Sequence, residues 1–260
     1  MSVADWRQSW NCRLRPFLLP QSVREGYLAA ASDSDAVRFG DIASIGIGYV
    51  TGANDFFHLR PSETVGWEIP ANLLCPTVRN SRLLPARQVT RQTVNRWLRS
   101  NEPMLLLKIP KNMDLPSSVE KYLETDRGKE ARKAYKCRTR DPWYSVPHVR
   151  IPDFFLTYMS GVTLGLVRNS AGVACTNTVH CVHIRQKTAC RRLLDAWATP
   201  FVQLSCEIEG HPLGGGVLKL EPGEANRVVL PSPVRSSFLS DGDTGAAIST
   251  MRSWRHHANA

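Results

Sequence analysis

The sequence predicts a mixed α/β fold in which short mixed sheets pack against helices. Short runs of β-branched and aromatic residues, typical of strands, alternate along the chain with segments of helical character. Glycines and prolines separate these runs, and the sequence contains no internal repeat and no low-complexity tract. At 260 residues the chain is long enough to bury a core in one large domain or two small ones.

The N-terminal part is expected to be a lead-in followed by a strand rich in glycine. Prolines break residues 1–36, with room for a helix at 23–31. The strand character that follows is carried by Ile45, Ile47, Tyr49 and Val50. The glycines among and after them, which indicate turns, bulges or close backbone contact, are Gly46, Gly48 and Gly52.

The middle of the chain is interpreted as mixed strand and helix. Residues 73–78 resemble a helix end followed by a loop, and residues 104–109 form an apolar run typical of a buried strand. Ser117 and Ser118 can cap a helix, whose apolar face would be formed by Val119, Tyr122 and Leu123. Gly128 is expected to weaken this helix, which residues 131–135 would resume.

The remaining elements continue the same alternation. Strands are expected at 153–159 and 173–184, with alternation over 179–184, and again at 217–220 and 228–230. A helix is expected at 188–198, with Leu193, Leu194 and Trp197 on its apolar face and Pro200 after its end. Residues 241–260 are interpreted as a loosely held terminal helix.

The net charge of the chain indicates which classes of binding partner it favours. A formal charge of +10 and a pI near 9.5 favour a polyanion such as DNA, RNA or an anionic membrane surface, the alternative being a merely basic protein. We find no apolar run long enough to span a bilayer and no signal peptide. The seven cysteines contain no CxxC pair, which favours reduced thiols and a cytoplasmic location.

A basic stretch with aromatic neighbours is the strongest local signal for nucleic-acid binding. Eight cations stand against three acidic residues: Lys121, Arg127, Lys129, Arg132, Lys133, Lys136, Arg138 and Arg140. On one helix, residues 129, 132, 133 and 136 would project to the same side and could pair with successive phosphates. Trp143, Tyr144 and His148 follow directly and could stack on bases. The alternative is a solvated helix face followed by core aromatics.

Several motifs point to chemistry but are incomplete. Asp141-Pro142-Trp143-Tyr144 is close to the [DNS]-P-P-[YFW] loop of amino-methyltransferases, with tryptophan in place of the second proline. No glycine-rich turn suitable for S-adenosylmethionine precedes it. The glycines at 46–52 and 214–216 match neither a dinucleotide fingerprint nor a P-loop, so a tight turn or a backbone approach to DNA is favoured. We therefore predict no catalytic residue and no cofactor site in this chain.

Metal-dependent chemistry is not predicted either. His180, Cys181 and His183 are close in sequence, with Cys175 upstream, but their spacing does not fit zinc. On a strand His180 and Cys181 would face opposite ways, so these residues are interpreted as structural. The sequence also lacks the P-D…[DE]-x-K arrangement that a restriction nuclease uses to bind Mg²⁺.

At residues 46–57, G-I-G-Y-V-T-G-A-N-D-F-F resembles the element that opens the C-terminal half of γ-class (TaqI-type) adenine-N6 DNA methyltransferases. R-D-P-W-Y at 140–144 is similar to an R-x-P-W-Y segment of the same region, and Arg168-Asn169 and Thr176-Asn177 resemble its N-containing strands. The stretches 204–210 and 213–222 resemble the part that closes it. The order and spacing of these segments agree over about residues 37–231.

The resemblance implies a target-recognition region of mixed α/β structure, without the catalytic domain. It implies double-stranded DNA as a partner, together with a separate catalytic subunit or domain that binds S-adenosylmethionine. The expected ranges are a lead-in at 1–36, a recognition domain at 37–235 with a subdomain break near 110–120, and a tail at 236–260. The predicted DNA contacts are Lys129, Arg132, Lys133, Lys136, Arg138, Arg140, Trp143, Tyr144, Asn54 and Lys219.

Three functions follow from these observations. The first is a non-catalytic DNA-specificity module or subunit of a restriction-modification system. The second is a self-sufficient methyltransferase with a divergent loop at 141–144. The third is a regulatory protein that docks on a methyltransferase and has lost DNA binding. The recognised DNA sequence cannot be deduced from the amino-acid sequence.

Overall fold

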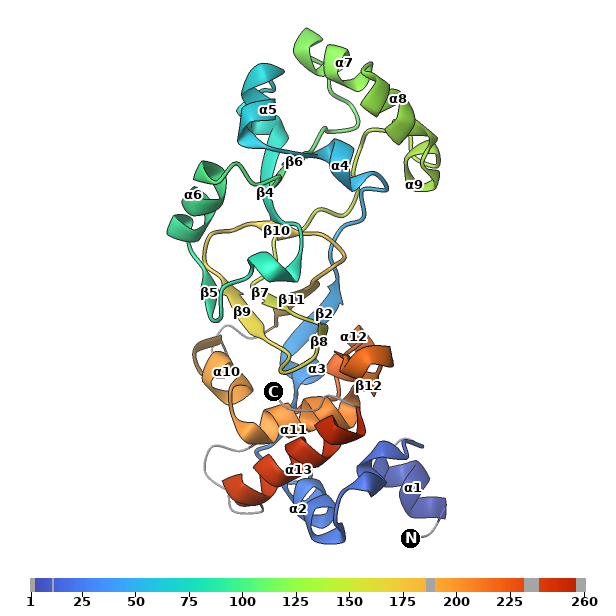
Figure 1. Cartoon of the computed structure of the whole chain (residues 1–260), viewed down its shortest axis with the longest axis vertical. Coiled ribbons are helices and arrows are strands. Elements are labelled where there is room, and N and C mark those ends of the chain that lie inside the picture. The colour runs from blue at the N-terminus through green and yellow to red at the C-terminus, as the bar shows by residue number, and fades with distance from the viewer. Residues whose placement is uncertain (1–2, 11, 186–189, 232–238, 256–260) are drawn as a thin grey trace. The chain divides into compact units, whose positions relative to one another are not determined.

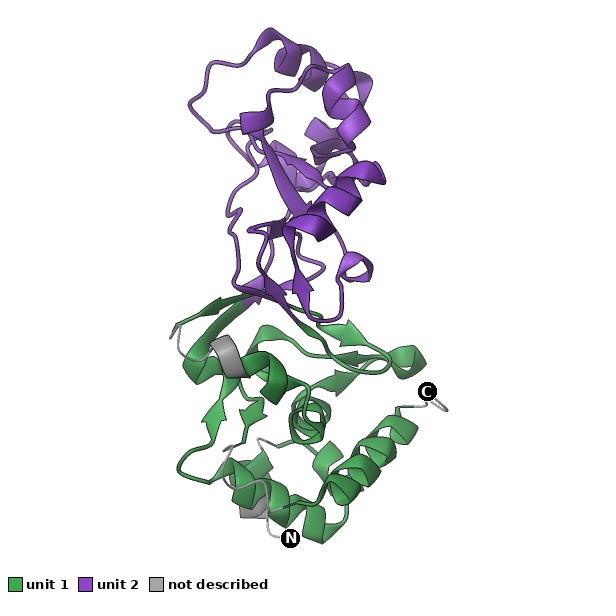
Figure 2. Ribbon diagram, turned by 90° about the vertical axis from the view of Figure 1, so that its left-hand side faces the viewer, with its two compact units in different colours: residues 1–45, 156–166, 182–260 green, residues 46–155, 167–181 purple. Residues whose placement is uncertain are grey.

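The computed structural model describes residues 3–10, 12–185, 190–231 and 239–255. The chain divides into two compact units, which Figure 2 shows in different colours. Unit 1 comprises residues 1–45, 156–166 and 182–260, and unit 2 comprises residues 46–155 and 167–181. The predicted ranges of a lead-in, a recognition domain and a tail describe function and stay predictions.

Unit 1 is mainly helical (Figure 1). Its helices are α1 (Val3–Trp10), η1 (Arg15–Leu18), α2 (Gln21–Ala31), α3 (Phe39–Ile42), α10 (Cys190–Trp197), α11 (Pro200–Glu209), η5 (Gly214–Gly216), α12 (Pro222–Ala225) and α13 (Asp241–Trp254). Its short strands are β1 (Val37–Arg38), β8 (Met159–Ser160), β12 (His211–Pro212), β13 (Leu218–Lys219) and β14 (Val229–Leu230). β1 pairs with β14, and β13 lies between β12 and β8, all antiparallel.

Unit 2 carries a four-stranded sheet surrounded by short helices. The helices are α4 (Asn54–Phe57), α5 (Pro61–Gly66), η2 (Ala71–Leu73), η3 (Ser81–Leu83), α6 (Arg91–Arg99), α7 (Ser117–Leu123), α8 (Asp126–Lys133) and α9 (Tyr135–Arg138). The sheet order is β10 (Ala174–Cys175), β4 (Leu74–Val78), β6 (Leu105–Leu107) and β3 (His58–Leu59). β6 is antiparallel to both of its neighbours, whereas β10 is parallel to β4.

A further sheet of five strands has the order β2-β11-β7-β9-β5. Its members are β2 (Ala43–Ile47), β11 (His180–Ile184), β7 (Phe154–Leu156), β9 (Leu166–Asn169) and β5 (Gln88–Val89). The expected alternation over 179–184 is wrong, because the side chains from Val179 to Val182 are all buried. A strand with both faces covered shows no alternation of burial.

Most elements expected from the sequence are present. The helix near 23–31 is α2, the buried strand near 104–109 is β6, and the strands near 217–220 and 228–230 are β13 and β14. The helix expected at 188–198 is α10, and residues 188 and 189 lie outside the described part of the chain. Pro200 does more than end α10, since it occupies the first turn of α11.

Residues 74–78 contradict the expected loop and form β4. The strand forms although it contains Pro76, which has no N–H to donate. The backbone N–H of Thr77 donates to the Met104 carbonyl at 2.8 Å, and Lys108 N–H donates to the Leu73 carbonyl at 2.8 Å. Pairing with β6 on one side and β10 on the other therefore makes this segment a strand, although its local sequence does not predict one.

The lead-in is part of the core of unit 1. Trp10 stacks on Tyr27 with ring centroids 5.9 Å apart, and Tyr27 stacks on Phe201 at 5.4 Å. The Tyr27 hydroxyl lies 2.9 Å from Ser205 Oγ, which accepts a hydrogen bond from Val229 N. These contacts join the lead-in to α11 and β14.

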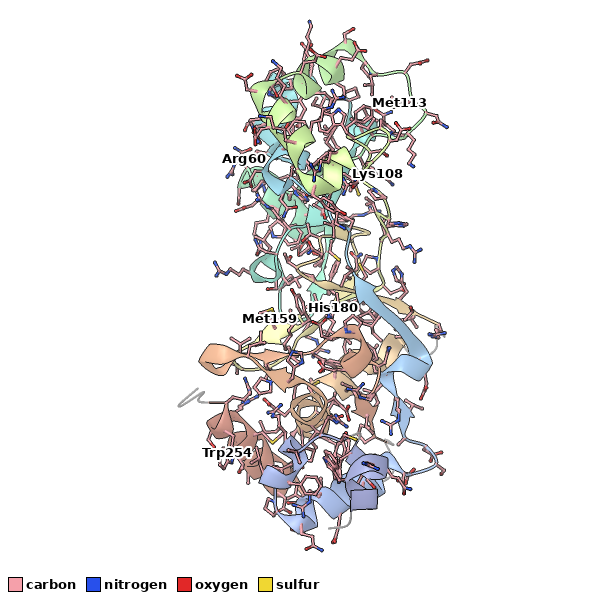
Figure 3. The ribbon with its side chains drawn as sticks, turned by 90° about the vertical axis from the view of Figure 1, so that its right-hand side faces the viewer. Arg60, Lys108, Met113, Met159, His180 and Trp254 are labelled. Carbon is pink, nitrogen blue, oxygen red and sulfur yellow. The ribbon has the colours of Figure 1, made fainter. Side chains whose placement is uncertain are left out.

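The terminal helix α13 is held by packing. Ala247, Ile248 and Met251 are buried in the same cluster as Trp10 and Tyr27. Trp254, near the end of the helix, is exposed (Figure 3). A helix is therefore present within the expected range 241–260, of which residues 256–260 lie outside the described part of the chain. The expectation that it is loosely held is wrong, because three buried side chains anchor it.

Two buried glutamates of α11 form ion pairs with arginines from other parts of unit 1. Glu209 forms ion pairs with Arg13 and, at 2.8 Å, with Arg227. Glu207 pairs with Arg15 at 3.5 Å, Arg252 at 3.6 Å and Arg255 at 2.6 Å. Both glutamate side chains are 3% exposed, and that of Arg255 is 1% exposed. These buried pairs connect the lead-in and α13 to α11.

Candidate nucleic-acid interface

The glycine-containing segment at 46–57 forms a tightly packed corner of unit 2. A Cβ on residue 48 would lie 2.3 Å from the carbonyl oxygens of both Cys175 and Thr176. The close backbone approach expected at this glycine is therefore made to the protein's own chain. Gly52 has a positive φ of 86°, which favours glycine.

We expect Gly48→Ala to destabilise the protein by about 3 kcal/mol or more, because the new methyl group would push β10 away from this segment. Gly46→Ala is the matched control, since a Cβ at residue 46 meets nothing within 4 Å. Urea denaturation followed by circular dichroism measures both variants. Equal unfolding midpoints would contradict the role assigned to Gly48.

Tyr49 and His58 form a buried polar pair beneath this corner. The Tyr49 hydroxyl lies 2.8 Å from His58 Nε2 and 2.7 Å from Thr77 Oγ1. His58 Nδ1 lies 2.9 Å from the carbonyl oxygen of Asn54, which can only accept, so Nδ1 carries the proton of the neutral ring. Burial lowers the pKa of His58 to about 4. The histidine thus positions α4 in its uncharged form.

Stability is expected to fall as the pH falls, because the unfolded chain protonates His58 near pH 6.5 and the folded protein only near pH 4. The contribution is fully present above pH 6.5 and decreases below it. From pH 7.5 to pH 5 the loss from this group is about 2 kcal/mol. His58→Gln should show a correspondingly weaker pH dependence in urea denaturation, and an unchanged dependence would refute this assignment.

The two segments that carry the family resemblance pack on each other. Phe56 stacks on Tyr122 with centroids 4.8 Å apart, and Trp143 contacts both Phe56 at 5.7 Å and Phe57 at 6.4 Å. The Tyr122 hydroxyl donates to the Phe56 carbonyl at 2.7 Å. Trp143 is therefore half-buried against the core of unit 2, as the alternative of core aromatics anticipated.

Arg140 stabilises the same corner through hydrogen bonds. Its guanidinium donates to the Val50 carbonyl at 2.6 Å and to the Thr51 carbonyl at 2.7 Å. Burial lowers its pKa. Two of its donors are therefore committed to the backbone of the 46–57 segment, which leaves less of this side chain for DNA.

The basic stretch lies on three short helices. Thr125 caps α8 by accepting a hydrogen bond from Gly128 N at 3.2 Å. A Cβ on residue 128 would lie 2.0 Å from the Leu123 carbonyl oxygen, so the junction of α7 and α8 requires glycine. α8 ends at Lys133, and the ψ of 139° at the next residue, Ala134, is not helical. The expected helix weakened at Gly128 and resumed at 131–135 is therefore wrong. Ser117 and Ser118 provide no cap either, since Ser118 Oγ donates to the Glu68 carbonyl.

The expected single stripe of residues 129, 132, 133 and 136 is also wrong. Lys129 and Arg132 line one pocket beside α8, and Lys133 lines another. Lys136 belongs to α9, beyond the break at Ala134. All four side chains are exposed, but the break at Ala134 separates Lys136 from the other three, which stand at i, i+3 and i+4 on α8.

The α9 surface consists of Tyr135, Lys136 and Arg138. Tyr135 is 64% exposed, and its ring centroid lies 5.8 Å from Lys136 Nζ and 5.6 Å from Arg138 Cζ. Within the described residues, neither cation pairs with a carboxylate, and Arg132 pairs with none either. An exposed ring between two unpaired cations suits contact with a nucleic acid. The sequence predicted both cations but missed Tyr135, although it stands between Lys133 and Lys136.

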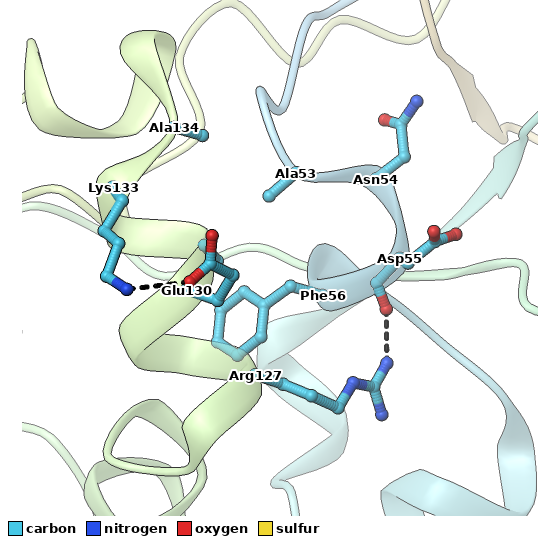
Figure 4. A pocket seen from close by; sticks show the side chains of 9 residues that line it. Ala53, Asn54, Asp55, Phe56, Arg127, Glu130, Lys133 and Ala134 are labelled. Carbon is cyan, nitrogen blue, oxygen red and sulfur yellow. Dashed lines mark hydrogen bonds and ion pairs between the residues drawn. The ribbon is translucent and has the colours of Figure 1, made fainter.

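A pocket of about 470 Å³ lies between α4 and α8 (Figure 4). Asn54 and Lys133 are among the residues that line it, and Lys133 is paired with Glu130 at 2.9 Å. The Asn54 amide oxygen accepts a hydrogen bond from Thr51 at 2.6 Å, and its side chain is exposed. Asn54 therefore combines a fixed orientation with an exposed side chain whose amide nitrogen has no hydrogen-bond partner among the described residues.

A second pocket, of about 820 Å³, lies between α7, α8 and the 140–144 segment. Trp143 and Tyr144 form its aromatic wall, with ring centroids 6.0 Å apart. Lys129 and Arg132 line it together with acidic residues of α7, and Lys129 also forms a 3.7 Å ion pair with Asp126. The two predicted aromatic residues thus share a pocket with two of the predicted cations.

Lys219 is the one predicted contact that belongs to unit 1. It lies on β13 and forms an ion pair with Glu221 at 2.5 Å. The glycines at 214–216 before it form a turn in which Gly215 and Gly216 have positive φ. Gly216 is also bonded through its carbonyl to Arg255, so this turn serves the packing of unit 1.

The histidines and cysteines near residue 180 lie within the packed part of the chain. His180 is 1% exposed, and Cys175 and Cys181 are free thiols whose Sγ atoms are 3.2 Å apart. The part of the chain that the structure describes contains no cluster of three or more histidine, cysteine or acidic side chains that could hold a metal. Among the described helices, none is long and apolar enough to cross a membrane.

The fold is similar to that of part of a solved restriction enzyme. The type IIG restriction endonuclease BpuSI superposes with a TM-score of 0.53 over 92% of this chain and 28% of that chain, at 14% sequence identity. This likeness concerns the fold alone, and with the observed elements it confirms the predicted mixed α/β class.

The sequence comparisons give the family. The chain is 22% identical over 199 residues to the type II methyltransferase M.AccI of Acinetobacter calcoaceticus, a match that covers 75% of this chain and 36% of that protein. This chain thus spans about a third of the length of that curated relative. The family model of the C-terminal domain of the type II methyltransferase M.Eco57I matches residues 13–251. The chain belongs to this family, which confirms the predicted resemblance to the C-terminal region of DNA methyltransferases.

Proposed function

We propose that this chain is the DNA target-recognition module of an adenine-N6 DNA methyltransferase in a restriction-modification system. It binds double-stranded DNA and positions it for a separate catalytic subunit or domain, which holds S-adenosylmethionine. The α9 surface carries the proposal, because two exposed cations, which pair with no carboxylate of the described residues, flank an exposed tyrosine on a chain of net charge +10. Such a surface pairs with phosphates and releases their counterions. We place the complex in the cytoplasm.

The packing of the 140–144 segment supports this division of labour. In an amino-methyltransferase loop the aromatic residue is free to stack on a flipped base. Here Tyr144, the residue at that aromatic position, is half-buried against the core of unit 2. Trp143, which replaces the second proline, is packed on Phe56 and Phe57, and Arg140 is bonded to two carbonyl groups. A segment held from both ends in this way suits a structural corner beside the DNA better than a catalytic loop.

The test is a titration of the purified chain with a 30-base-pair duplex between 50 and 200 mM KCl. Affinity should fall steeply with salt, and no methyl group should be transferred from labelled S-adenosylmethionine until the catalytic partner is added. Co-expression with neighbouring open reading frames, followed by mapping of methylated adenines, identifies that partner. Methyl transfer by the chain alone would favour a self-sufficient enzyme, and absence of DNA binding would favour a docking regulator.

A further inference from the structure

A second basic surface lies on α6, away from the residues that the sequence pattern singled out. Residues 69–101 contain six arginines, no lysine and no acidic residue: Arg79, Arg82, Arg87, Arg91, Arg96 and Arg99. α6 lies on the other side of β4 and β6 from α8 and α9 in Figure 1. The surface is therefore distinct from the α9 surface within the same unit.

The core anchors α6 through one face. Trp97 is 6% exposed and belongs to a buried cluster with Met104 and Phe155. Thr90 caps the helix by accepting a hydrogen bond from Thr93 N, and the Thr93 hydroxyl lies 3.2 Å from Thr90 N. Capping and a buried tryptophan fix the orientation of this nine-residue helix, so its outer face is presented rigidly.

The outer face of α6 has an unusual composition. Its exposed residues include three arginines and both amide side chains of the helix: Arg91, Gln92, Asn95, Arg96 and Arg99. Solvated helix faces usually mix acidic and basic residues, which stabilise the helix in pairs. This face contains no acidic residue, and within the described chain Arg91, Arg96 and Arg99 form no ion pair with one. A role in solubility alone does not explain this selection of side chains.

Arginine, glutamine and asparagine are the side chains that read base edges. In the major groove, arginine forms a pair of hydrogen bonds with guanine, and asparagine or glutamine forms a pair with adenine. A groove about 12 Å wide admits one α-helix. We infer that α6 is the base-reading helix of this module and that Gln92, Asn95 and Arg96 specify the DNA sequence. This inference rests on the proposed function and assigns phosphate contacts to the α9 surface.

Replacing the arginines of α6 by lysine tests whether they contact bases specifically or only attract DNA through their charge. The variant Arg91→Lys/Arg96→Lys/Arg99→Lys keeps the net charge but loses the planar, two-point contact of the guanidinium. The side chains are exposed, so the variant is expected to fold. A thermal melt checks this. A second variant, Gln92→Ala/Asn95→Ala, removes the amide groups and leaves the charge untouched.

The experiment is selection of bound sequences by the full chain from a random-sequence 20-base-pair duplex pool. The unchanged protein should enrich one motif. Both α6 variants should reduce that enrichment at least about fivefold for each base that the helix no longer reads, with the salt dependence of binding unchanged. The control Lys136→Gln/Arg138→Gln should bind all sequences more weakly and enrich the same motif.

Each outcome is decisive. If the α6 variants enrich the original motif as strongly as the unchanged protein, the inference is wrong and the proposed function stands. If the unchanged protein binds duplexes but enriches no motif, both the inference and target recognition are wrong. If it binds no DNA, the α6 surface serves another kind of partner and the proposed function also fails.

Discussion

Lys136→Gln/Arg138→Gln is expected to weaken binding to a DNA duplex on the order of 50-fold in 0.1 M salt. Each cation that neutralises a phosphate releases close to one counterion, which at this salt concentration contributes about eightfold to affinity. The slope of log affinity against log salt should decrease by about 2. Fluorescence anisotropy with a labelled duplex at several salt concentrations measures both quantities. Glutamine keeps the Cβ of residue 136, which packs beside Gly52.

The matched control is Lys108→Gln/Lys111→Gln. Both lysines are exposed and also lie in unit 2, outside the α9 surface. This variant removes the same charge from the chain, so it separates local contact from net charge. If the two double variants lose affinity equally, the α9 surface has no special role, and only the overall charge attracts DNA.

Glu207→Gln is expected to destabilise unit 1 by about 3 to 5 kcal/mol. The substitution keeps the shape of the side chain but leaves the buried guanidinium of Arg255 without its carboxylate. Arg15 and Arg252 lose the same partner. Urea denaturation monitored by circular dichroism should show a much lower unfolding midpoint. Since the pair is buried, the effect should persist at 0.5 M salt.

Glu25→Gln is the control for this substitution. Glu25 is exposed on α2 and accepts a hydrogen bond from Gln21, so its loss should cost less than about 0.5 kcal/mol. Similar midpoints for the two variants would mean that the arginines around Glu207 are solvated in the folded protein. The cluster would then contribute little to the attachment of the lead-in and α13.

The amino-acid sequence predicted those elements whose local pattern agrees with their final surroundings. The apolar run at 104–109 is a buried strand, and the helix of Val119, Tyr122 and Leu123 buries that face. It also predicted the family, because the segments at 46–57 and 140–144 are recognisable in order. Residues 74–78 could not be predicted in this way, since their strand depends on partners elsewhere in the chain.

For the candidate site, the sequence by itself determined the net charge, the basic composition of 121–140 and the presence of aromatic residues beside it. Only the tertiary structure decided which of these groups are free. Arg140 is bonded to carbonyl groups 89 and 90 residues away, Trp143 is packed on α4, and the non-helical Ala134 separates Lys136 from α8. The physical reason is that the periodicity of a sequence predicts only the face of its own helix or strand on which a side chain lies. Its partner comes from a distant segment, and that partner decides whether the side chain can contact DNA.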